Sequence, residues 1–97
     1  MEIQQIREGD KLTCRLSGRL DVNTSPELLE KIKLADVKEL VFDLSDVDYV
    51  FSAGLRVFLQ FQKYMNFNKG SMKIVNAQDS VKEIFEIVGF SNFMDIA

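Results

Sequence analysis

Ser52 is the residue of this chain whose position best suits a chemical role. Before it lies the strand-like run Glu39-Leu40-Val41-Phe42-Asp43-Leu44, and after it begins a long segment with the periodicity of an amphipathic helix. Serine is a preferred N-cap residue, because its oxygen can accept a hydrogen bond from a first-turn amide. The free amides and the dipole of a helix N-terminus also favour an anion, such as a phosphate carried by the serine hydroxyl. Ser52 is therefore either a helix cap or a phosphorylation site.

The two residues that follow Ser52 carry very small side chains. Ala53 and Gly54 leave the first turn of the expected helix bare, so another surface can approach its backbone. The helix is predicted over residues 52–67 and has an unusually wide apolar stripe. One face carries Leu55, Phe58, Leu59 and Met65, and Val57, Phe61 and Tyr64 extend it sideways. Either a neighbouring helix covers the extra width, or a partner binds there beside Ser52.

The composition argues against several kinds of chemistry. The chain has 97 residues, a net charge of −3, one cysteine and no histidine. It lacks a Gly-x-Ser-x-Gly elbow and a phosphate-binding glycine loop, so we expect no catalytic residue, no metal ion and no cofactor. A net negative charge makes nucleic acid a poor partner. Because no apolar run reaches membrane-spanning length and the N-terminus lacks a signal-peptide pattern, we expect a cytoplasmic protein that does not insert into a membrane.

Hydrophobic patterning predicts a single α/β domain over residues 1–97. Strands are expected over residues 2–7, 11–17, 38–44 and 72–75 and at the chain's end, with helices beginning near Thr24, Ser52 and Ser80. The segment from Gly18 to Asp21 is expected to lead out of the sheet, and Cys14 to be buried in a strand. The order ββαβαβαβ predicts a small mixed β-sheet with helices packed on it.

Three pieces of the sequence, taken in this element order, resemble a known family. They are Gly18-Arg19-Leu20-Asp21, the strand Leu40–Leu44, and Ser52-Ala53-Gly54-Leu55 at the start of a helix. Together they resemble the STAS domain and, within that group, the stand-alone anti-sigma factor antagonists of bacteria. The resemblance covers essentially the whole chain, and Ser52–Leu55 is its most specific part.

The resemblance implies a function for Ser52. In that family the serine at this position is phosphorylated by an anti-sigma factor that is also a protein kinase. The unphosphorylated domain binds the kinase and frees a sigma factor, the phosphorylated domain is released, and a PP2C-type phosphatase resets it. The residues that the resemblance assigns to partner binding are Asp21, Phe51, Ser52, Ala53, Gly54, Leu55 and Arg56. Asp21 would lie near Ser52, and Asp43, Asp46 and Asp48 would also be close and would oppose a phosphate.

Two residues depart from the pattern of many family members. Phe51 replaces an aspartate that could orient the hydroxyl, and Ala53 replaces a serine or threonine, which leaves Ser52 as the only hydroxyl of the motif. Two other functions stay open, both without a phosphorylation switch: a subunit of a membrane transport ATPase and a scaffold in a signalling assembly. The sequence also leaves homodimerisation open.

Overall fold

The structure is a computed structural model that describes residues 1–97. Its elements follow the predicted order ββαβαβαβ. In chain order they are β1 (Glu2–Glu8), β2 (Lys11–Leu20), α1 (Ser25–Lys31), β3 (Glu39–Val50), α2 (Ser52–Phe67), β4 (Ser71–Val75), α3 (Asp79–Ile87), a short 3₁₀ helix (Phe90–Asn92) and β5 (Asp95–Ile96). None of the helices combines the length and the apolar character that crossing a membrane requires.

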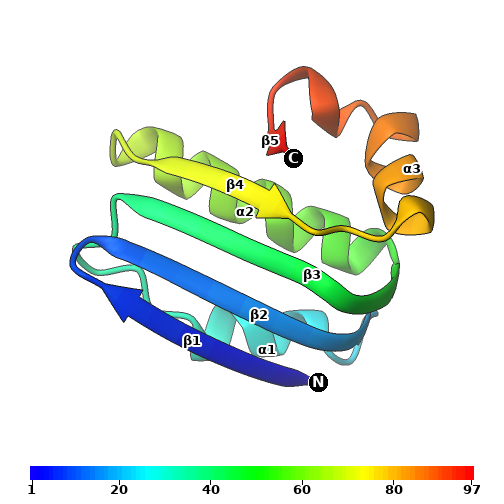
Figure 1. Ribbon diagram of the computed structural model, residues 1–97, viewed down its shortest axis with the longest axis horizontal. Helices are drawn as coiled ribbons and strands as arrows, with labels where there is room; N and C mark the ends of the chain where they lie inside the picture. The colour runs from blue at the N-terminus through cyan, green and yellow to red at the C-terminus, as the bar shows by residue number, and fades with distance from the viewer.

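The five strands form one mixed sheet with the order β1-β2-β3-β4-β5, which confirms the predicted fold class. β1 and β2 form an antiparallel hairpin, and β2 to β5 run parallel to one another. Each parallel pair needs a crossover connection, and right-handed crossovers that always step in the same direction place their helices on one face of the sheet. Figure 1 shows α1 and α2 behind the strands, and α3 beyond the end of β4.

The core lies between this face of the sheet and the helices. Alternate residues of the central strands are buried there, among them Leu12, Cys14 and Leu16 of β2 and Leu40, Phe42 and Leu44 of β3. The ring of Phe58 in α2 packs edge-on against Phe42, with ring centroids 5.1 Å apart, and against Phe85 of α3 at 5.9 Å. The predicted burial of Cys14 is confirmed, and this burial raises the pKa of its thiol to about 12.

Two strands are longer than the sequence pattern predicts. Gly18 and Leu20 stay in the sheet and pair with Val47 and Val50 of β3, across two register shifts. The predicted exit from the sheet at Gly18 is therefore wrong, as is the predicted end of β3 at Leu44. The extension also removes Asp43 from the neighbourhood of Ser52, because Asp43 lies seven positions before Val50 in a strand that rises about 3.3 Å per residue.

None of the three α-helices begins with a side-chain cap. The N-cap positions of α1, α2 and α3 are Thr24, Phe51 and Gln78, and none of these side chains caps its helix. The Thr24 hydroxyl instead donates to the Arg19 carbonyl oxygen at 2.8 Å. Neither α1 nor α3 therefore begins with a capping box.

Candidate functional site

Ser52 lies at a sharp junction where β3 turns directly into α2 (Figure 1). The residue between them, Phe51, has an extended backbone, with φ −84° and ψ 173°, so the helix starts at Ser52 itself. The Phe51 amide donates to the Leu20 carbonyl oxygen at 2.7 Å. This bond ties the start of α2 to the end of β2 and holds Ser52 at the surface, where its side chain is exposed.

The interpretation of Ser52 as an N-cap is wrong, because Ser52 is the first residue inside the helix. The amides of Ser52, Ala53 and Gly54 donate to no backbone or side-chain group of the chain, and the first turn contains no acidic residue. Unpaired amides at a helix N-terminus carry a partial positive charge. The geometry therefore leaves an exposed hydroxyl beside three free donors, an arrangement that suits an anion on that oxygen.

Gly54 permits the close approach predicted for the bare first turn. A Cβ atom at this position would lie 2.7 Å from Leu20 Cβ and 3.0 Å from Val50 Cγ1. The surface that comes close is therefore the end of the protein's own sheet, and Gly54 is buried against it. Its assignment to partner binding stays a prediction, and the structure gives it a packing role that positions Ser52.

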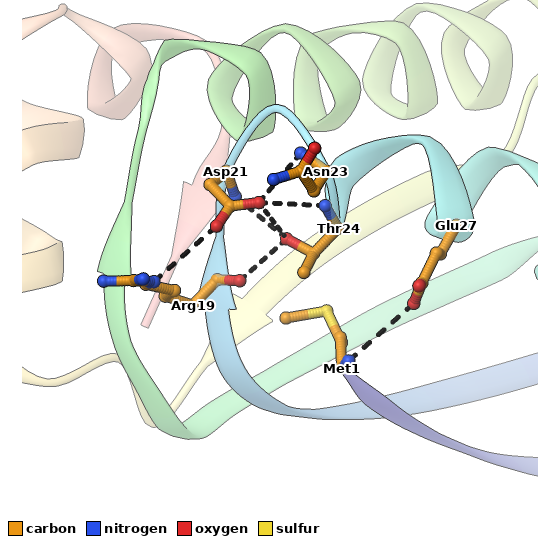
Figure 2. A network of polar contacts seen from close by, with 6 residues as sticks. All are labelled: Met1, Arg19, Asp21, Asn23, Thr24 and Glu27. Atoms are coloured by element: carbon orange, nitrogen blue, oxygen red, sulfur yellow. Dashed lines mark hydrogen bonds and ion pairs between the residues drawn. The ribbon is translucent and has the colours of Figure 1, made fainter.

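Asp21 is held inside the loop between β2 and α1. Its Oδ1 accepts hydrogen bonds from the amides of Asn23 and Thr24, each at 2.9 Å, and its Oδ2 lies 3.6 Å from Arg19 Nε (Figure 2). The bonds from the amides of Thr24 and Asn23 lower the pKa of Asp21 below its ordinary value. Because the Phe51 amide donates to the Leu20 carbonyl oxygen, the loop that holds Asp21 and the start of α2 lie side by side, the arrangement that the family resemblance implies.

Exposed apolar side chains flank Ser52. Tyr49 and Phe51 are each 45% exposed, and their ring centroids are 4.5 Å apart. Val22, in the loop after Asp21, is 73% exposed. The sequence pattern, which predicts that β3 ends at Leu44, does not place Tyr49 on a strand beside Ser52. The burial of Val47 and Val50, with exposed residues between them, marks the longer strand.

A groove runs between α1 and α2 from the neighbourhood of Ser52. It consists of two hollows of about 230 Å³ and 430 Å³, which share Leu29 and Gln60 as lining residues. The smaller hollow reaches Ala53 and Arg56, and the larger one reaches Tyr64. The explanation by internal packing holds for Val57 and Phe61, which are buried in the core. Tyr64 stays 44% exposed, and partner binding at this part of the stripe stays a prediction. The part of the stripe formed by Leu55 and Leu59 is half-buried against the core.

Comparison with known proteins gives a consistent result. The family model described as STAS domain matches residues 2–97. The anti-sigma-B factor antagonist of Listeria monocytogenes is 30% identical over 99 residues, covering 99% of this chain and 86% of that protein. The anti-sigma-B factor antagonist of Bacillus subtilis is 34% identical over 88 residues, covering 89% and 81%.

Solved structures share the fold. The unphosphorylated anti-sigma factor antagonist SpoIIAA superposes with a TM-score of 0.85 at 20% identity, covering 99% of this chain and 88% of that chain. Its phosphorylated form, described as a Bacillus cell fate determinant, gives a TM-score of 0.78 at 19% identity, covering 99% and 91%.

Proposed function

Because this chain belongs to the STAS domain family, we propose that it is an anti-sigma factor antagonist whose partner binding is switched by phosphorylation of Ser52. Two relatives carry the name anti-sigma-B factor antagonist, and SpoIIAA is known in an unphosphorylated and a phosphorylated form. The observation that carries the proposal is the exposed Ser52 hydroxyl at the start of α2, beside three amides without acceptors.

In this proposal the partner is a cytoplasmic anti-sigma factor with serine kinase activity, and a PP2C-type phosphatase removes the phosphate. The protein itself catalyses nothing. The carboxylate of Asp21 is oriented by its own loop, and Phe51 supplies no carboxylate next to the serine. The group that accepts the Ser52 proton therefore comes from the kinase.

The phosphate would act on the interface far more than on the fold. A phosphoserine adds about −1.5 to −2 charges. Within the chain, the helix N-terminus stabilises such an anion by about 0.3–1 kcal/mol. At an interface built around Tyr49, Phe51 and Val22 the same phosphate would be desolvated, at a cost on the order of several kcal/mol. Each 1.4 kcal/mol is roughly tenfold in affinity, so one phosphate is enough to release the partner.

Reconstitution with a purified anti-sigma factor kinase tests the proposal. With ATP we expect the mass of one phosphate on the wild type and on Ser80→Ala, and none on Ser52→Ala. Ser80 is the matched control because it is also an exposed serine in the first turn of a helix. A phosphate located at another residue would contradict the assignment.

The binding arm uses calorimetric titration of the same kinase. Ser52→Glu should weaken binding about tenfold or more, whereas Ser80→Glu, with the same added charge at α3, should leave it unchanged. Equal affinities of the wild type and Ser52→Glu would refute the switch. Equal affinities would instead be expected of a structural subunit of a transport ATPase or of a signalling scaffold.

A further inference from the structure

The groove between α1 and α2 has a charge opposite to that of the chain as a whole. Its lining includes two cations, Arg56 near Ser52 and Lys33 toward the other end, and no carboxylate. The whole chain has 15 acidic and 12 basic residues. Neither Arg56 nor Lys33 makes an ion pair within the chain, whose three pairs involve the N-terminus, Arg15 and Arg19. Both cations are therefore free to meet an anionic ligand.

Between the two cations the groove is apolar and about as long as a short helix. Leu29 is 43% exposed at its middle, and Tyr64 stands at its far end, while Val57 and Phe61 form a buried floor. From Ala53 to Tyr64 the groove follows α2 over eleven residue steps, or about 16 Å at 1.5 Å per step. That length accommodates about three turns of a docked helix, which would present side chains at i, i+3, i+4 and i+7.

A buried polar atom lies at the end of the groove near Ser52. Ser25 is only 1% exposed and lines the smaller hollow, and its Oγ has no hydrogen-bond partner in the chain. Buried hydroxyls are almost always paired, because leaving one unpaired is unfavourable. A polar group of a bound segment that enters this hollow would pair with it.

We infer that this groove docks an acidic amphipathic helix of the partner protein, with apolar side chains against Leu29 and Tyr64 and carboxylates on Arg56 and Lys33. The identification of the partner rests on the proposed function. A helix docked in this groove would also be sensitive to phosphorylation of Ser52. Arg56 is four residues after Ser52 on α2, so a phosphate on Ser52 would compete with the docked carboxylate for the same guanidinium.

A defined peptide tests the docking site. The probe is a synthetic peptide of about 15 residues with leucines at i, i+3, i+4 and i+7, a glutamate on each side of this leucine stripe and alanine elsewhere, compared with a version in which lysine replaces each glutamate. Titrated into the ¹⁵N-labelled protein, the glutamate peptide should shift the amide signals of α1 and α2 saturably, and the lysine peptide should not. Arg56→Gln should weaken the glutamate peptide on the order of tenfold. Lys63→Gln, an exposed cation of α2 outside both hollows, should not change its affinity.

Several results would overturn the inference. One is equal binding of the two peptides. Another is a set of amide shifts confined to residues 87–93, where Ile87, Val88 and Phe93 expose apolar side chains. A third is the absence of saturable shifts. Dodecanoate, a simple anionic amphiphile, is titrated as a further probe. If it binds the groove saturably and the peptide does not, the groove binds a free amphiphile. If the groove signals change with protein concentration alone, the groove binds a second copy of the chain. Ser52 is unmodified and no kinase is present in this experiment. Its failure would therefore leave the Ser52 switch standing, and a failure of the phosphorylation assay would leave the peptide result standing.

Discussion

A single methyl group added at Gly54 should destabilise the protein by driving the start of α2 away from the sheet. The Cβ of Gly54→Ala would lie 2.7 Å from Leu20 Cβ and 3.0 Å from Val50 Cγ1. Favourable contacts between carbon atoms lie at about 3.5–4.0 Å, so neighbouring atoms must move by roughly 0.5–1 Å. Val50 can adjust its side chain. Leu20 Cβ cannot rotate away, because it is attached directly to the backbone of β2, and the Leu20 carbonyl is bonded to Phe51.

Two opposing terms set the size of the effect. Overpacking of a close contact costs about 1–3 kcal/mol. Alanine in place of glycine in a helix recovers up to about 1 kcal/mol, since alanine loses less backbone entropy. Because the obstructing atom belongs to the backbone-attached part of Leu20, we expect the upper half of the first range. The net loss is then about 1–2 kcal/mol in the free energy of unfolding, or a fall in Tm of about 4–16 °C for a domain of this size.

Thermal unfolding followed by circular dichroism measures this change. The first control is Ala53→Gly, which alters helix propensity in the same turn without a clash and should cost no more than about 1 kcal/mol. Adding Val50→Ala to Gly54→Ala should not restore stability, because Leu20 Cβ remains in place. A Tm equal to or above that of the wild type would refute the reasoning, since it would mean that the start of α2 can shift freely and propensity alone decides.

Three further results are expected. Ser52→Glu should keep or raise the Tm relative to Ser52→Gln, by at most about 8 °C at low salt, because an anion at the start of α2 is worth about 0.3–1 kcal/mol; a clear fall in Tm would mean that charge at this residue damages the fold. Asp21→Asn should lower the Tm at about pH 7. The folded-state pKa of Asp21 lies below its ordinary 3.8, so the contribution of its carboxylate is present above that value and is lost as the pH falls through the lowered pKa; a difference in Tm that does not shrink toward about pH 2 would contradict this. Cys14, with its buried thiol and a pKa of about 12, should react with Ellman's reagent at about pH 8 only after urea unfolds the protein, and rapid labelling of the native state would refute its burial.

Local patterns in the sequence determined much of the architecture. The bounds of α2, Ser52 to Phe67, and the burial of Cys14 are as predicted, because helix and strand periodicity are set by neighbouring residues. The element order follows in the same way. The motif from Ser52 to Leu55 also located the candidate site, since a serine at a strand-to-helix junction is visible without any long-range contact.

Features that depend on residues far apart in the chain were decided only by the tertiary structure. Gly18 and Leu20 stay in the sheet because they pair with Val47 and Val50, about thirty residues away, and their own neighbours do not reveal this. The same pairing brings Leu20 against Gly54, makes Ser52 the first helical residue instead of a cap, and carries Asp43 away from the site. The groove likewise exists only because α1 packs beside α2. The sequence thus specified which residues could do chemistry, and the pairing of β2 with β3 and the packing of the two helices decided how they are presented.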